Sequence, residues 1–283
     1  AIVVTLAIGW VVVVRSVESP PGEALWILLL ALGLAVPSFV DDLGALPALP
    51  RFAWQITLAI VGTFLLDGPV PLFHGYISGG TSVAVTVFLW VGFINLLNFT
   101  DGIDGHAGSM ATAVGLGVFF LALAGEVPPG LGQLGLTTAA AAAGFLLWNW
   151  SPARIFMGDV GSVTLGFLLA WLLLRTAREG HWAPAVILPL VYLTDTGLTY
   201  LAKIFRGERF WLPHRDHFYQ RAVRRPGVTH GRVVATVLIG DLILIGMAVL
   251  AARGMVWSSL LVAGATSAAV MVYLSVGIGE DST

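Results

Sequence analysis

The sequence contains no cysteine and few charged residues, and both absences narrow the class of protein. Without cysteine the chain can form no disulfide, no thiolate metal site and no cysteine nucleophile. Charged residues make up 11% of the 283 positions and hydrophobic residues 57%, whereas soluble domains carry about 25% charged residues. This balance and a mean hydropathy of +0.90 predict an integral membrane protein. The net charge is only −2 and no basic domain is present, so nucleic acid is not expected as a partner.

Apolar runs of membrane-helix character recur along the whole chain. They fall at 1–14, 24–40, 52–66, 83–97, 107–124, 134–148, 160–174, 183–202, 233–251 and 255–276. Because only short polar stretches separate them, they predict an all-α polytopic membrane protein of about ten transmembrane helices, in one domain over 1–283. The first run is shorter than the roughly 20 residues of a spanning helix, so we expect further sequence ahead of residue 1.

Basic residues divide unevenly between the two faces that result when the runs alternate across the bilayer. One face has ten (Arg51, Arg154, Lys203, Arg206, Arg209, Arg215, Arg221, Arg224, Arg225, Arg232) and the other has four (Arg15, Arg175, Arg178, Arg253). By the positive-inside rule the first face is cytoplasmic. The stretches 41–44, 98–105, 149–162 and 213–225, which hold most of the polar side chains, all fall on that face.

Acidic residues stand at helix ends on this face. "DDLG" places Asp41 and Asp42 at the C-terminus of an apolar run, where the helix dipole disfavours negative charge. The pair fits a base or metal-facing group, and equally a solvated helix end. In "NLLNFTDGIDG" (95–105), glycines would let the backbone approach a phosphate while Asp101 or Asp104 faces a metal ion or a ligand hydroxyl. The simpler alternative for this stretch is a glycine-rich turn between two helices.

"NWSPARIFMGDVGS" (149–162) repeats this arrangement ahead of the next helix. Mg²⁺ prefers one or two carboxylates together with substrate phosphates, and Asp159, framed by Gly158 and Gly161, can supply one. Phe156 is close enough in sequence to stack on a nucleotide base, and the amide of Asn149 has the donor and acceptor to read one.

The loop 203–232 is rich in basic residues and contains "HRDHFYQ" (214–220). The mixture of His214, Arg215 and His217 with an aspartate is typical of a phosphate-handling loop. The alternative is a basic juxtamembrane loop that is attracted to anionic lipid.

In this order, the four motifs resemble those of the polyprenyl-phosphate N-acetylhexosamine-1-phosphate transferases, the superfamily that includes phospho-MurNAc-pentapeptide translocase. The match covers some two-thirds of the chain, from "DDLG" to "HRDHFYQ". It implies a single transmembrane catalytic domain with a cytoplasmic cleft in the bacterial inner membrane. "VYLTDTGLTYLAKIFRG" also resembles the family's Asp-Thr helix, which maps onto Asp195. The residues and the resemblance together give a candidate set: catalytic Asp41, Asp42, Asp101, Asp104 and His217; substrate-binding Asn98, Asn149, Phe156, His214 and Arg215; metal-binding Asp159.

Two departures distinguish this chain from the family pattern. The family often has a His-x-His-His cluster in the last cytoplasmic loop, whereas "HRDHFYQ" retains only His217 of it, which resembles the O-antigen-initiating branch of lipopolysaccharide biosynthesis. The family's Pro-Thr-Pro-Arg-Gly-Gly-like loop would precede residue 1. A homodimer is the assembly suggested by the family.

The implied reaction transfers an N-acetylhexosamine-1-phosphate from a UDP-sugar to undecaprenyl phosphate and releases UMP. Both substrates are anions, which calls for Mg²⁺, with Mn²⁺ as a substitute, and for cationic side chains. Asp41 or Asp42 either takes a proton from the lipid phosphate or acts as a covalent nucleophile, and the sequence leaves both routes open. The alternative function is a membrane transporter or channel that uses the intramembrane acidic residues.

Overall fold

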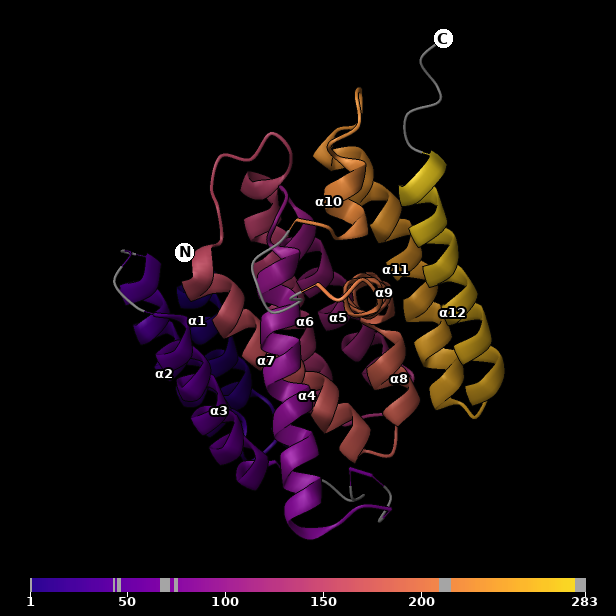
Figure 1. Ribbon diagram of the computed structural model, residues 1–283. Helices are drawn as coiled ribbons and strands as arrows, with labels where there is room; N and C mark the ends of the chain where they lie inside the picture. The colour runs from indigo at the N-terminus through magenta and orange to yellow at the C-terminus, as the bar shows by residue number, and fades with distance from the viewer. Residues whose placement is uncertain are drawn as a thin grey trace.

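The expected all-α fold is confirmed by a computed structural model, which describes residues 2–42, 44, 47–66, 72–73, 76–208 and 215–277 (Figure 1). These residues form helices and no strand. The helices are α1 (Ile2–Ser16), α2 (Ala24–Asp42), α3 (Ala48–Leu65), α4 (Gly79–Thr100), α5 (His106–Leu123), α6 (Pro129–Asn149), α7 (Gly158–Arg178), α8 (Trp182–Ile187), α9 (Leu190–Phe205), α10 (Phe218–Ala222), α11 (His230–Ala252) and α12 (Val256–Val272), followed by a π-helical turn (Tyr273–Gly277).

Seven of the described helices are long and apolar enough to cross a membrane, namely α2, α4, α5, α6, α7, α11 and α12. The apolar helices α1 and α3 are shorter. The protein is therefore a multi-pass membrane protein. The helix expected over 183–202 is instead two helices, α8 and α9, with Pro189 between them. The break is expected at Pro189, because proline lacks the N–H that a continuous helix needs. After it the chain changes direction: α9 is seen end-on in Figure 1, whereas α11 and α12 run up the picture.

Helix α7 forms the centre of the bundle and is buried along almost its entire length. Two tryptophans hold neighbouring helices against it. Trp10 packs its ring on Trp171 with centroids 5.4 Å apart and donates from Nε1 to Oγ1 of Thr138 at 3.0 Å. Trp90 donates from Nε1 to the carbonyl oxygen of Phe167 at 3.1 Å. An indole N–H without a partner is costly in an apolar interior, so these bonds fix which helix faces meet.

A buried ion pair joins α2 to α7 at the end of the bundle opposite the polar motifs. Nε of Arg175 lies 3.1 Å from Oε1 of Glu23, and the same guanidinium pairs with Glu179. Glu23 directly precedes α2, and Arg175 lies in the last turn of α7. Since breaking a buried pair leaves an uncompensated charge, this contact fixes the register of α2 along α7. The same register determines how Asp41 and Asp159 meet at the other end.

Helices α5 and α6 approach each other closely where two glycines cross. A Cβ atom at Gly115 would lie 2.6 Å from the carbonyl oxygen of Gly135, and a Cβ atom at Gly135 would lie 2.8 Å from that of Gly115. Small residues at such crossings allow backbone-to-backbone packing in membrane helices. This packing joins the helix that follows the 101–105 loop to the helix that precedes the 149–157 loop.

We predict that Gly115→Ala destabilises the protein by about 1–3 kcal/mol, because the new methyl group would overlap backbone atoms that cannot move independently. Gly144→Ala in α6 is the matched control, since a Cβ atom there would meet nothing within 4 Å. The apparent Tm of the detergent-purified variants measures both. If Gly115→Ala melts no lower than Gly144→Ala, the two helices do not depend on this crossing.

Candidate active site

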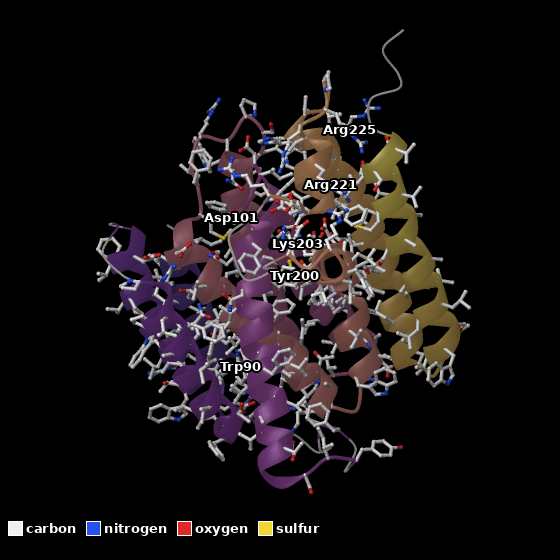
Figure 2. All side chains as sticks on the ribbon, in the orientation of Figure 1. Trp90, Asp101, Tyr200, Lys203, Arg221 and Arg225 are labelled. Carbon is white, nitrogen blue, oxygen red and sulfur yellow. The ribbon has the colours of Figure 1, made fainter. Side chains whose placement is uncertain are left out.

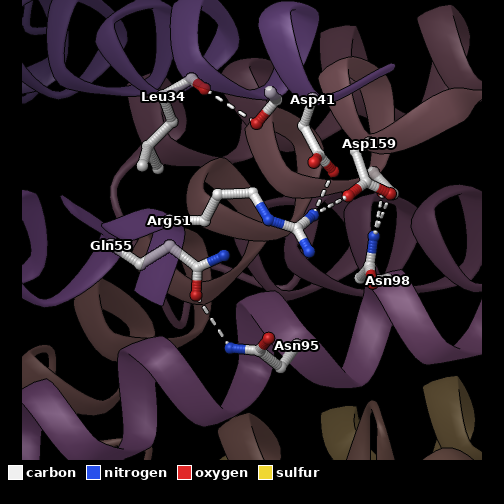
Figure 3. Close-up of polar contacts among 9 residues, drawn as sticks. Leu34, Asp41, Arg51, Gln55, Asn95, Asn98 and Asp159 are labelled. Carbon is white, nitrogen blue, oxygen red and sulfur yellow. Dashed lines mark hydrogen bonds and ion pairs between the residues drawn. The ribbon is translucent and has the colours of Figure 1, made fainter. Parts of the chain in front are cut away.

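Arg51 lies between two carboxylates that come from different helices (Figure 3). Its Nη1 atom is 2.6 Å from Oδ2 of Asp159 and also bonds Oδ2 of Asp41. Asp41 stands in the last turn of α2, Arg51 in the first turn of α3 and Asp159 in the first turn of α7. All three side chains are partly exposed to solvent. Asp41 and Asp159, which the sequence analysis placed on the same membrane face, thus share one positive group, Arg51.

Asn98 in the last turn of α4 completes this cluster. Its Nδ2 atom donates to Oδ1 of Asp159 and to Oγ of Ser162, both at 2.9 Å. The two oxygens of Asp159 thus face different partners, an amide on one side and a guanidinium on the other. One turn earlier on α4, Asn95 donates to Oε1 of Gln55 at 2.9 Å, which joins α4 to α3 in the same way.

The residues around Asp159 fit a divalent cation by their chemistry. Carboxylate oxygens are the ligands that Mg²⁺ prefers, and those of Asp41 and Asp159 already converge on one positive group. Among the described residues no group of three or more His, Cys, Asp or Glu side chains is arranged to hold a metal ion. A cation here would therefore have two carboxylates from the described protein and would need substrate oxygens for the rest. Magnesium binding stays a prediction.

Asp101 caps the C-terminus of α4 near this cluster. Burial, and to a lesser degree the negative charge of Asp159, raise the pKa of Asp101 to about 7. A carboxyl group that exchanges its proton near neutral pH suits a general acid or base better than an ordinary aspartate does. This environment agrees with the catalytic role predicted for Asp101, which remains to be tested.

Asp104 and Asn149 connect the two glycine-rich loops. Oδ2 of Asp104 accepts from the N–H of Ala153 at 3.1 Å, and Oδ1 of Asn149 accepts from the N–H of Gly105 at 2.9 Å. Nδ2 of Asn149 donates to the carbonyl oxygen of Ile155 at 2.8 Å. Both ends of the Asn149 amide thus bind backbone groups in the structure. The contacts show that Asp104 and Asn149 join the 101–105 loop to the 149–157 loop by hydrogen bonds. The roles of Asp104 in catalysis and of Asn149 in base recognition stay predictions.

The candidate residues of the last loop differ in their exposure to solvent: His217 is buried and Arg215 is exposed. His217 is buried, with its Nδ1 atom 3.2 Å from Oδ1 of Asp195, and its ring stacks near that of Phe99 with centroids 6.5 Å apart. Arg215 and Phe156 are exposed, as expected of side chains that meet a soluble substrate. Two other candidates, all of His214 and the side chain of Asp42, lie outside the described residues.

Tyr219 joins this loop to the end of α4. Its hydroxyl donates to the carbonyl oxygen of Phe99 at 2.5 Å, and a Cβ atom at Gly102 would lie only 2.4 Å from that hydroxyl oxygen. Gly102 is therefore required by the packing of Tyr219. Sequence analysis missed the site contacts of both Tyr219 and Arg51. The spacing of "PRFAWQ" (50–55) contains no signal that would direct Arg51 toward Asp159.

We predict that Gly102→Ala lowers stability by about 1–3 kcal/mol, because the added methyl group would displace the Tyr219 hydroxyl. Tyr219→Phe removes the oxygen that the methyl group would meet. The double variant should therefore lose less stability than the sum of the two single losses, as measured by the apparent Tm of the purified proteins. Additive losses would show that the two residues do not share this contact.

Comparison with known proteins assigns the chain to a family. The sequence profile described as "Glycosyl transferase family 4" matches residues 24–177, more than half of the chain. The matched segment contains Asp41, Arg51, Asn98, Asp101 and Asp159, so the cluster in Figure 3 lies within it.

Similar proteins carry out phosphosugar transfer according to their names. The chain is 28% identical over 239 residues to a "Probable undecaprenyl-phosphate N-acetylglucosaminyl 1-phosphate transferase" of Bacillus subtilis, covering 81% of this chain and 66% of that protein. It is 32% identical over 247 residues to the "Phospho-N-acetylmuramoyl-pentapeptide-transferase" of Nocardia farcinica, covering 71% of this chain and 68% of that protein. It thus spans about two thirds of the length of these relatives. The chain belongs to glycosyl transferase family 4, within the polyprenyl-phosphate N-acetylhexosamine-1-phosphate transferase superfamily that its ordered motifs indicated.

Proposed function

We propose that this protein transfers an N-acetylhexosamine-1-phosphate from a UDP-sugar to polyprenyl phosphate, giving a polyprenyl-diphosphate sugar and UMP. The observation that carries the proposal is the convergence of Asp41, Arg51, Asn98 and Asp159 at one end of a membrane bundle. The proposed substrate is an N-acetylhexosamine donor for a cell-surface glycan, of the type that initiates O-antigen synthesis.

In the proposed reaction an oxygen of the lipid phosphate attacks the β-phosphorus of the UDP-sugar. The new phosphorus–oxygen bond replaces the bond to the bridging oxygen, which leaves with UMP. Asp159 and Asp41 would hold Mg²⁺, which would supply positive charge to the diphosphate. Asp41 or Asp42 would remove the remaining proton of the lipid phosphate or attack first as a covalent nucleophile. Arg51 would bind a phosphate oxygen once the carboxylates have another cation.

A small pocket lies beside the cluster, where the phosphate of the proposed lipid acceptor would bind. It is bordered by Arg51 and Asp159 at its polar part and by apolar side chains of α2, α3 and α7, including Leu34, Trp54 and Val163. With an empty volume of about 240 Å³, it has room for a phosphate group but not for a polyprenyl chain.

The proposed location is the bacterial inner membrane, with the site facing the cytoplasm. The ten-to-four distribution of basic residues supports this orientation. Figure 2 shows Asp101, Lys203, Arg221 and Arg225 toward one end of the bundle and Trp90 further along toward the other. A transporter would need a site near the midplane that is reached from both sides, whereas these polar residues gather at one end.

The direct test is UMP release by the purified protein in detergent, with polyprenyl phosphate, Mg²⁺ and either UDP-N-acetylglucosamine or UDP-N-acetylgalactosamine. We expect UMP only when both lipid and nucleotide sugar are present, together with a radiolabelled lipid-linked sugar. Absence of product with every UDP-N-acetylhexosamine tried would reject the proposed function.

We predict that Asp159→Asn abolishes turnover while the protein still folds, because an amide oxygen is a poorer ligand for a hard cation than a carboxylate. Glu208→Gln is a control, since it removes an exposed carboxylate on the same side of the bundle. UMP release at increasing Mg²⁺ concentrations measures the effect. Wild-type turnover and wild-type metal dependence in Asp159→Asn would contradict the assignment of Asp159.

We also predict that Arg215→Lys lowers kcat/KM about tenfold or more, which corresponds to about 1.4 kcal/mol of transition-state stabilisation. A guanidinium can hold two phosphate oxygens at once, whereas a lysine keeps the charge but not this geometry. His217→Ala should cause a similar loss, and Arg224→Lys should stay near wild type. Equal behaviour of all three variants would mean that the loop only contacts anionic lipid.

A further inference from the structure

Asp195, a buried residue in α9, receives four polar contacts. Its Oδ1 atom accepts from the N–H of Phe218 at 3.0 Å, and its Oδ2 atom accepts from the N–H of Tyr219 at 3.2 Å. Oδ1 also lies 3.2 Å from Nδ1 of His217 and 3.3 Å from the Oγ1 donor of Thr199. Three of these partners are consecutive residues of the last loop, so one carboxylate holds the backbone and the side chain of 217–219 together.

The contact to the backbone replaces a cap that the loop does not provide. The short helix α10 begins at Phe218, and His217 at its N-cap position makes no side-chain cap bond. The first N–H groups of a helix have no partner within it. Asp195 supplies that partner from a different helix, and hydrogen bonds to an ionised acceptor are roughly twice as strong as neutral ones.

The contact to the ring determines how His217 can act. Since the oxygen of a carboxylate accepts and does not donate, the nitrogen that faces Asp195 carries a proton. In the neutral ring this leaves the lone pair on Nε2, so the carboxylate selects one tautomer as well as one ring orientation. The ring is further held by stacking on Tyr219, with centroids 5.8 Å apart and planes inclined by 18°.

Tyr219 extends the effect of Asp195 to the cluster around Asp159. The amide of Tyr219 binds Asp195, and its hydroxyl donates to the carbonyl oxygen of Phe99. Burial, and then the charge of Asp195, raise the pKa of Tyr219, so its hydroxyl remains a donor. Phe99 directly follows Asn98, which contacts Asp159. A continuous set of contacts therefore runs from α9 through α10 to the end of α4.

We propose that Asp195 is a positioning residue for phosphosugar transfer, acting through His217 and through the 217–219 backbone rather than by touching substrate. This inference rests on the proposed function. Asp195 fixes His217 in one tautomer and fixes the Tyr219 contact that supports the end of α4.

A double-mutant cycle tests the role of Asp195 in the reaction. Asp195→Asn keeps the shape of the side chain but replaces one acceptor oxygen with an NH₂ group, which cannot accept from a backbone N–H. We expect kcat for UMP release to fall about tenfold or more, with KM for the UDP-sugar within about threefold of wild type. His217→Asn should give a similar loss.

The double variant should be no more than about threefold worse than the poorer single variant, because the effects of residues that act as a unit are not additive. Losses that multiply would overturn the proposal and leave Asp195 with a general structural role.

Hydrogen exchange provides a readout that does not depend on activity. In Asp195→Asn, peptides covering 217–222 should exchange faster than in wild type, because either the N–H of Phe218 or that of Tyr219 loses its acceptor oxygen. Asp241→Asn is the matched control, since Asp241 is another buried carboxylate in a membrane helix and bonds Tyr192 rather than the loop. It should leave exchange in 217–222 and the rate of UMP release unchanged. Equal protection of the loop in all three proteins would overturn the proposal.

The two measurements also separate the possible failures. If wild-type protein releases no UMP, the proposed function is wrong, while the exchange experiment still decides whether Asp195 supports the loop. If Asp195→Asn does not fold, Thr199→Val removes only the contact from the Thr199 hydroxyl. That variant should lower kcat about two- to fivefold and raise exchange in 217–222 slightly, and the proposal fails if neither changes.

Discussion

The attraction of one arginine to two carboxylates determines how the polar end of this bundle is assembled. Asp41 lies in the last turn of α2 and Asp159 in the first turn of α7. Near the membrane boundary less water is present to screen charges, so the two carboxylates repel each other unless a cation lies between them. Arg51 satisfies both from the first turn of α3. The contact can form only if α2, α3 and α7 keep one relative position. The ion pair of Glu23 with Arg175 at the opposite end of α2 and α7 maintains that position.

Sequence reasoning predicted much of this arrangement and missed the parts that depend on side-chain direction. That Asp41, Asn98 and Asp159 lie at one end of the bundle was predictable, because the hydrophobic runs and the basic loops put all three at one membrane face. The role of Arg51 was not, because it counted only as one more positive charge until the structure showed which helix it faces. The break at Pro189 could have been anticipated from the proline alone, but the resulting direction of α9 depends on packing that no local pattern encodes.

The glycines show the same distinction between composition and placement. A glycine-rich loop suggests close approach of a phosphate, yet Gly102 accommodates the hydroxyl of Tyr219 from a segment more than a hundred residues away. Gly105 has a φ of +79°, in the left-handed region that favours glycine, and is the N-cap residue of α5. Both glycines thus serve the protein's own packing. The sequence "TDGIDG" suggested that these glycines let the backbone approach a ligand, but it did not indicate which protein groups they contact.

In the structure, each oxygen of Asp159 binds another protein group, as do those of Asp195 and the amide of Asn149. This is what burial near a membrane demands, since polar atoms without partners are costly there. It also limits how the proposed substrates can enter. A phosphate that binds Arg51 withdraws the cation that Asp41 and Asp159 share, and a divalent cation that binds those carboxylates releases Arg51. Phosphate binding alone would take Arg51 from the two carboxylates, and cation binding alone would take the carboxylates from Arg51, whereas each group keeps an oppositely charged partner when both bind. If the protein carries out the proposed reaction, we therefore expect the metal ion and the diphosphate to bind as one unit, the form in which a nucleotide sugar and Mg²⁺ would act.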